Sequence, residues 1–145
     1  MKVNIKIDEK IAETNVTISA PKMTKEVENI VSIINNASAS NLVCYKSNLV
    51  YFIEKSKVVR FYKDEAHVCV ETMSQTYVIK STLKSLEETT GKNFIRISNS
   101  EIVNLNFISH VDLSDKGTIK IVFKNKQYTY ASRRNVKLIK ERLGI

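Results

Sequence analysis

A run of short hydrogen-bonding side chains separates two apolar segments in the sequence FIRISNSEIVNLN, residues 94–106. Residues 94–97 alternate like the end of a β-strand, and the apolar residues of 102–105 follow at no strand-like period. Short polar side chains can hydrogen-bond a partner at a small cost in conformational entropy. The first candidate for a binding loop is therefore the polar run that interrupts the strand pattern, Ser98, Asn99 and Ser100.

A doubled arginine stands further along the chain, in the segment ASRRNVK, residues 131–137. Residues 91–145 hold 11 Lys and Arg against 4 Asp and Glu, a net charge of +7. Residues 1–90 hold 12 against 11, a net charge of +1. A basic region beside a neutral one is typical of a face that meets a polyanion, although basic runs also occur on solvated surfaces.

The sequence contains none of the motifs that mark common catalytic sites. It has no Gly-rich phosphate loop, no HExxH and no GxSxG, and neither His67 nor His110 stands near a nucleophile at a recognisable spacing. Cys44 and Cys69 lie in apolar stretches without a CxxC or Cys/His cluster, so we expect two reduced, buried thiols and no metal site. We predict a protein that is not an enzyme and has no cofactor.

The length of 145 residues and the apolar content of 43% suit one folded domain with a short appendage. No apolar run approaches the roughly 18 residues that cross a bilayer. The start, MKVNIKIDEK, alternates charged and apolar residues and lacks the apolar block of a signal peptide. We therefore expect a cytoplasmic protein.

The first 40 residues are predicted to form a small ββα segment. Residues 3–7 and 16–18 alternate like short strands, and a proline at position 21 ends the second one. The apolar residues then recur at helical spacing, which predicts an amphipathic helix over 22 to about 36. Such a piece cannot bury both faces alone, so we expect residues 1–40 to pack on the rest of the chain or to form a homodimer.

After residue 41 the pattern is almost wholly β. It predicts two strands around the turn 46–48 and further strands at 58–62, 67–73, 76–80, 94–97, 107–113, 118–124 and 127–131. A short helix is predicted at 82–89, and a last helix begins behind Ser132, whose side chain can cap it. The expected fold class is mostly β with few helices (α+β), a multi-stranded domain with a short C-terminal helix.

Two segments, FIRISNSEIVNLNFISHVDL and GTIKIVFKNKQYTYASRRNVKLIKERL, together resemble the core signature of the LytTR family of bacterial DNA-binding domains. The likeness covers about 57–143, because VVRFYKDEAHVCVET and TYVIKSTLKSLEE resemble the first strands and connecting helix of that family. It implies a LytTR-like DNA-binding domain over 41–145, with no receiver domain before it. The residues that match the signature are Arg96, Ser100, Val103, Asn104, Leu105, Ser132, Arg133 and Arg134.

The resemblance implies that loops, instead of a recognition helix, enter successive major grooves of double-stranded DNA. Asn99 would then lie at a loop tip, where its amide can pair with an adenine edge, with Ser98 and Ser100 beside it. A purely structural interpretation stays open, because the same short polar run can begin a helical turn as a cap. Asn104 is expected to bond the backbone inside the fold instead of touching DNA.

The second loop implied by the resemblance lies where the last hairpin meets the terminal helix. Arg134 would take guanine O6 and N7 with its planar fork, while Arg133, Lys137 and Ser132 would meet phosphates. His67 falls near another contact position of the family. Which of the two arginines reads a base stays open at this point.

These observations predict a bacterial, sequence-specific transcription regulator that binds double-stranded DNA as a homodimer. One alternative is a basic module that binds RNA without base specificity. Another is a protein-interaction module that uses a sheet edge and the helix at 22–36, although such a module would not need the concentrated charge of +7.

Overall fold

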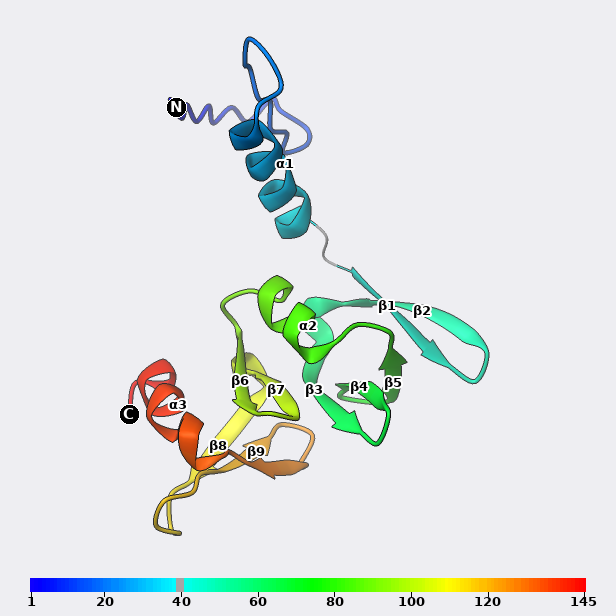
Figure 1. Ribbon diagram of the computed structural model, residues 1–145, viewed down its shortest axis with the longest axis vertical. Helices are drawn as coiled ribbons and strands as arrows, with labels where there is room; N and C mark the ends of the chain where they lie inside the picture. The colour runs from blue at the N-terminus through cyan, green and yellow to red at the C-terminus, as the bar shows by residue number, and fades with distance from the viewer. Residues whose placement is uncertain (39–40) are drawn as a thin grey trace. The chain divides into compact units, whose positions relative to one another are not determined.

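The computed structural model describes residues 1–38 and 41–145 of the chain. Backbone contacts divide the chain into two compact units, Met1–Asn35 and Asn36–Ile145 (Figure 1). No helix in the described ranges is both long and apolar enough to span a membrane.

Most of the helix α1, Lys25–Ser38, lies in the N-terminal unit, close to where the sequence predicts it. Two glutamates, Glu26 and Glu28, lie in its first turn, and the Thr24 hydroxyl accepts a hydrogen bond from the Val27 amide at 3.3 Å. These acceptors offset the free amides and the positive end of the helix dipole.

The two strands predicted in this unit are absent from the structure. Residues 3–7 and 16–18 are described without strand pairing, so the expected ββα segment is a helix preceded by irregular chain. Alternation gives a segment one apolar face, but a strand also needs backbone hydrogen bonds to a neighbouring strand. Even a pair of strands is only marginally stable in water when nothing packs on it. Val3, Ile5 and Ile7 accordingly stay exposed, at 75%, 82% and 89% of their surface.

The C-terminal unit consists of two antiparallel sheets. The larger one has seven strands in the order β2-β1-β5-β4-β3-β7-β6, and the smaller one has the order β10-β9-β8. The strands are β1 Asn41–Lys46, β2 Leu49–Glu54, β3 Val58–Asp64, β4 His67–Thr72, β5 Thr76–Ile79, β6 Phe94–Ser98, β7 Glu101–Asn104, β8 Ile108–Asp112, β9 Lys120–Phe123 and β10 Tyr128–Tyr130. The mostly β fold class is therefore confirmed.

Tight turns set the register of the hairpins. Ser47 and Asn48, with φ of 50° and 64°, join β1 to β2, and this pair of left-handed residues matches the right-handed twist of the flanking strands. Lys126, with φ of 70°, lies in the turn between β9 and β10. Both turns fall where the sequence predicts them.

Two apolar cores lie on the two faces of the seven-stranded sheet. Neighbouring residues of a strand point to opposite faces, so Ile102 packs in one core and Val103 in the other. The first core lies under α2, Leu83–Thr89, and the second core is closed by β8, β9 and α3, Val136–Leu143. All four residues of β7 are buried, and the sequence analysis missed this strand because a strand covered on both faces shows no alternation.

The helices begin with different caps. The Thr82 hydroxyl accepts from the Ser85 amide at 3.1 Å and caps α2, where the sequence predicts a helix. The prediction that Ser132 caps the last helix is wrong. Ser132 precedes a 3₁₀ turn, η3 (Arg133–Asn135), without a side-chain cap bond, and its hydroxyl accepts from the Asn135 side chain at 2.9 Å. The helix α3 starts one turn later, behind Asn135.

Candidate nucleic-acid interface

The polar run 98–100 forms the turn of the β6–β7 hairpin and does not cap a helix. The Ser98 and Ser100 hydroxyls lie 3.2 Å apart, and the Ser100 amide donates to the Ser98 hydroxyl at 3.2 Å. The Ser100 carbonyl accepts from the Lys63 amide at 2.8 Å. The two serines thus hold the turn closed, and Asn99 is left exposed at its tip.

Arg96 fixes the same turn from inside the hairpin. Its Nε donates to the Ser98 carbonyl and its Nη2 to the Asn99 carbonyl, both at 2.7 Å. Its Nη1 forms an ion pair with Glu87 of α2 at 2.9 Å. Sequence reasoning used Arg96 only as a match to a family signature and missed this role, because a side chain that bonds backbone carbonyls leaves no pattern in the sequence.

Arg134 and Asn99, the two residues predicted to read bases, are in direct contact. The Arg134 Nη2 donates to the Asn99 Oδ1 at 2.9 Å, although Asn99 lies in a turn of the larger sheet and Arg134 lies in η3, after the smaller sheet. The loops are also tied by the backbone, since the Ser132 amide donates to the Ile97 carbonyl at 2.9 Å. A small hollow of about 340 Å³ lies here, lined by Glu87, Arg96, Ser98, Asn99, Arg134 and Asn135.

Arg133 and Lys137 stand beside this contact with exposed side chains. Within residues 1–38 and 41–145, neither side chain makes a hydrogen bond or an ion pair. Arg133 lies in η3, and Lys137 follows one turn later in α3. Both cations are therefore available to an anionic partner.

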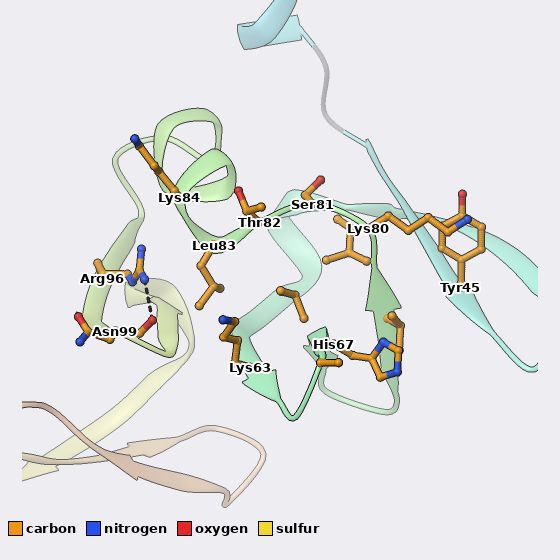
Figure 2. A pocket seen from close by; sticks show the side chains of 14 residues that line it. Tyr45, Lys63, His67, Lys80, Ser81, Thr82, Leu83, Lys84, Arg96 and Asn99 are labelled. Atoms are coloured by element: carbon orange, nitrogen blue, oxygen red, sulfur yellow. Dashed lines mark hydrogen bonds between the residues drawn. The ribbon is translucent and has the colours of Figure 1, made fainter.

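His67 is the exposed first residue of β4 and lies beside a larger hollow of about 700 Å³ (Figure 2). Asn99 lies on the rim of the same hollow, so these two predicted site residues share one surface depression. Three lysines, Lys63, Lys80 and Lys84, also line it, and none of its lining residues is acidic. The depression is therefore an electropositive surface next to the Asn99 loop.

The three lysines of this hollow were missed by the sequence analysis, which placed most of the positive charge in the last third of the chain. They come from β3, the residue after β5, and α2, and only the folded sheet brings them together. The Lys80 ammonium lies 4.5 Å from the centre of the Tyr45 ring, a cation–π contact that directs it along the surface. Charge summed along the sequence therefore underestimates the basic character of this face.

Asn104 lies inside the fold, as predicted. It is 1% exposed, and its Nδ2 donates to the Val58 carbonyl at 2.8 Å. Its Oδ1 accepts from the Asn106 amide at 3.0 Å. Both ends of the amide are satisfied by the backbone, so Asn104 fixes the chain at the end of β7 and does not face a partner.

Both cysteines are free and buried, as the sequence predicts. Burial raises the pKa of the Cys44 thiol to about 11, and burial likewise raises the pKa of the Cys69 thiol. Neither thiol is therefore a reactive thiolate near neutral pH.

The fold and the site define a β-rich domain that presents polar loops and a basic hollow on one surface. The family model of the LytTr DNA-binding domain matches residues 48–144. The chain belongs to this family, which confirms the predicted LytTR resemblance and makes the chain a DNA-binding protein of a family of transcriptional regulators, not an enzyme.

Relatives with a similar sequence span the whole chain. An HTH-type transcriptional regulator of Staphylococcus aureus strain MSSA476 is 39% identical over 146 residues, covering 100% of this chain and 99% of the relative. One of strain NCTC 8325 is 38% identical with the same coverage. Consecutive α-helices in the described residues of this chain are separated by five strands, so no helix-turn-helix is present there.

A solved structure has the same fold. The LytTr DNA-binding domain of a methyl-accepting/DNA response regulator from Bacillus cereus superposes with a TM-score of 0.70, covering 73% of this chain and 98% of that chain. Its sequence is 22% identical to this one, so the likeness concerns the fold alone.

Proposed function

We propose that this chain is a bacterial transcription regulator that acts in the cytoplasm and binds double-stranded DNA sequence-specifically. Its two loops, one at the β6–β7 turn and one between β10 and α3, enter one major groove together. This differs from the successive grooves that the resemblance implies, because a contact of 2.9 Å between Arg134 and Asn99 does not suit loops that lie a full DNA turn apart. The observation that carries the proposal is the hydrogen bond from Arg134 to Asn99 at 2.9 Å, because it supports one composite reading site built from two distant segments.

The contact between the two side chains leaves donors for DNA. Arg134 uses one Nη2 donor on the Asn99 Oδ1, so its other guanidinium donors are free to meet guanine O6 and N7. The Asn99 Nδ2 is likewise free to donate to a base, and a rotation that releases its Oδ1 allows a bidentate pair with adenine. In the free protein the mutual bond keeps both side chains in place before DNA arrives.

The remaining residues hold the DNA backbone. Arg133 and Lys137 meet phosphates on one side of the reading site, while the lysines of the large hollow, Lys63, Lys80 and Lys84, meet them on the other. His67 borders that hollow and reaches the groove edge from the β3–β4 turn. Ser98 and Ser100 shape the turn and offer their hydroxyls to the nearest phosphate.

Competition in a gel-shift assay tests this function. A labelled duplex selected from random sequences should be displaced by its own unlabelled copy, less by random duplex, and least by single-stranded RNA or a neutral polymer. Equal displacement by RNA would favour a non-specific RNA-binding module. No displacement by any nucleic acid would favour a protein-interaction module.

We further propose that residues 1–40 mediate homodimerisation while residues 41–145 bind DNA. The exposed apolar side chains of Val3, Ile5 and Ile7 support this, since a second copy is one way to cover them. Light scattering at tens of micromolar should give the mass of a dimer, and deletion of residues 1–40 should give a monomer that still shifts DNA. A monomer in the intact protein, both free and on DNA, would contradict this assembly.

A further inference from the structure

The two reading loops belong to different sheets, so their contact depends on how the sheets are held together. Asn99 lies in a turn of the seven-stranded sheet, and Arg134 follows β10 of the three-stranded sheet. Apolar packing between the sheets supplies cohesion, since Ile121 and Phe123 of the smaller sheet share one core with Val103 of the larger sheet. Apolar contacts are non-directional, however, and do not by themselves fix a position to within a hydrogen bond.

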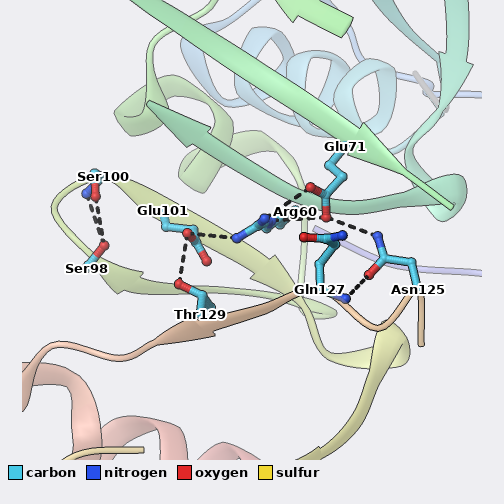
Figure 3. A network of polar contacts seen from close by, with 8 residues as sticks. All are labelled: Arg60, Glu71, Ser98, Ser100, Glu101, Asn125, Gln127 and Thr129. Atoms are coloured by element: carbon cyan, nitrogen blue, oxygen red, sulfur yellow. Dashed lines mark hydrogen bonds and ion pairs between the residues drawn. The ribbon is translucent and has the colours of Figure 1, made fainter. Parts of the chain in front are cut away.

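A buried polar network crosses between the two sheets (Figure 3). Arg60 of β3 binds Glu71 of β4 through two bonds of 3.0 Å and Glu101 of β7 through one of 3.3 Å. From the smaller sheet, the Thr129 hydroxyl donates to the Glu101 Oε1 at 3.1 Å, and the Asn125 amide donates to the Glu71 Oε2 at 3.1 Å. Glu71 therefore receives two donors from Arg60 and Glu101 receives one, and each carboxylate receives one further donor from the smaller sheet.

The Glu101–Thr129 bond joins the residue just after the first reading loop to a residue just before the second. Glu101 directly follows Ser100 and so ends the loop that carries Asn99. Thr129 is the middle residue of β10, the strand that leads into η3 and Arg134. If Glu101 and Thr129 move relative to each other, the two loops therefore move as well, because only a few residues of extended chain separate each loop from its end of the bond.

The network is costly for the fold. The side chains of Arg60 and Glu101 are only 13% and 10% exposed, and the Glu101 Oε2 has no hydrogen-bond partner in the described residues. Burial raises the pKa of the Glu101 carboxyl, and the charge of Arg60 only partly opposes this. Well-packed apolar residues often replace a buried ion pair without loss of stability, so stability alone does not account for these residues.

We propose that Glu101 and Thr129 are positioning residues, whose hydrogen bond sets the separation of the Asn99 and Arg134 loops and thereby the sequence specificity of DNA binding. The inference rests on the proposed function, because it assumes that these two loops read bases. Neither residue touches DNA in this scheme, and both act through the geometry of Arg134 and Asn99.

The test compares Thr129→Val with Thr129→Ser. Valine keeps the shape of threonine but removes the donor, so the ratio of affinities for selected and random duplex should fall about five- to tenfold, part of the discrimination that one bidentate base contact supplies. Serine keeps the hydroxyl and should restore the ratio. Ile121→Val is the matched control, because it loosens the apolar contact between the same sheets. It should lower the melting temperature without changing the ratio.

A double-mutant cycle with Arg134→Ala separates the possible failures. If Thr129 acts through Arg134, then Thr129→Val should lower the ratio of affinities for selected and random duplex much less in the Arg134→Ala background than in the native chain. An unchanged ratio in Thr129→Val, or an equal fall in Ile121→Val, would overturn the positioning role alone. An unchanged ratio in Arg134→Ala would overturn the proposed reading site, and the inference with it.

Discussion

The loop at 98–100 and the loop at 132–134 meet at one hydrogen bond, yet they are built in different ways. The first is closed by its own serine hydroxyls and by two bonds from Arg96 to its carbonyls. The second is tied to β6 by the bond from the Ser132 amide to the Ile97 carbonyl, and the Asn135 amide and side chain bond the Ser132 carbonyl and hydroxyl. Both loops are thus held in place, but the first presents the short Asn99 side chain at its tip and the second presents two long, exposed arginines.

This difference predicts how each loop contributes to binding. A preordered turn positions the Asn99 side-chain amide at little further entropic cost. Loss of the bonds that hold this turn should therefore change which DNA sequences bind. A long arginine or lysine loses rotamer freedom on binding but contributes charge, so removal of a single side chain should have a local and separable effect.

Salt should produce the largest effect, because it weakens every charge contact of the surface at once. If roughly six phosphates are neutralised, the slope of log affinity against log salt should be about −5, a loss on the order of a thousandfold between 50 and 200 mM. Fluorescence anisotropy on a labelled duplex measures this slope. A flat response would contradict any role for the arginine loop and for the lysines of the large hollow.

Arg96→Ala should break the ordered loop. The turn loses both bonds to its carbonyls, and charged hydrogen bonds of this kind are worth about 1.5 to 3 kcal/mol. We expect a loss of that size in binding to the selected duplex, measured by titration, with a smaller loss on random DNA. Arg142→Ala is the control, because Arg142 also donates to a backbone carbonyl, that of Lys92, but lies far along α3. Equal losses of binding in Arg96→Ala and Arg142→Ala would mean that Arg96 contributes only its charge and does not order the turn.

Arg134→Ala should damage reading from the second loop. Loss of a bidentate guanine contact should cost about 1 to 3 kcal/mol on the selected duplex and much less on random duplex. Arg133→Ala serves as the neighbouring control, since it removes the same charge from the residue that does not contact Asn99. If the specificity loss instead follows Arg133, the two arginines exchange roles.

Lys137→Ala should have a smaller and non-selective effect. The side chain is exposed on α3, one turn beyond the arginines, and we expect it to neutralise one phosphate. Its removal should weaken binding to all duplexes alike and reduce the steepness of the salt dependence by about one. The ranking of duplexes should survive, and a changed ranking would place Lys137 at a base edge.

The smallest expected effect is a pH-dependent change in stability that comes from Glu101, the partner of Thr129. Burial raises the folded-state pKa of Glu101 above its ordinary value of 4.5, so its contribution to stability is present below that value and is lost as pH rises through the folded pKa. The stability of the native chain relative to Glu101→Gln should therefore fall as pH rises above 4.5, by at most about 1.4 kcal/mol per pH unit. Urea unfolding at several pH values measures the difference, and a rise in the same window would contradict it.

Much of the fold follows from local pattern. Strands that face one core and solvent, such as β9, alternate in the sequence and were predicted close to their bounds. The strand β7 was missed because both its faces are covered, and the strands at 3–7 and 16–18 were predicted wrongly because alternation does not provide a partner. Sequence pattern thus reports which face of a strand is buried, but not whether another strand lies beside it.

The candidate site was only partly visible in the sequence. The polar turn at Asn99 and the doubled arginine stood out by residue type, but their contact is a product of sheet docking. Lys80 and Arg96 gain their positions only through folding, one beside Tyr45 and the other beneath the turn. Residues that shape a site from distant strands have no spacing rule, so only the structure identifies them.

The two cores are built from different parts of the chain, so they do not become available together during synthesis on the ribosome. The first core is complete within residues 42–102, whereas the second also needs residues 119–139. Because the chain is made from its N-terminus, the residues of the first core are available before those of the second. A polypeptide released before residue 119 would leave Ile95 and Val103 uncovered on one face and would carry Asn99 without Arg134. Under the proposed function, nascent and truncated copies would therefore lack the complete reading site, and only the finished chain would compete for operators.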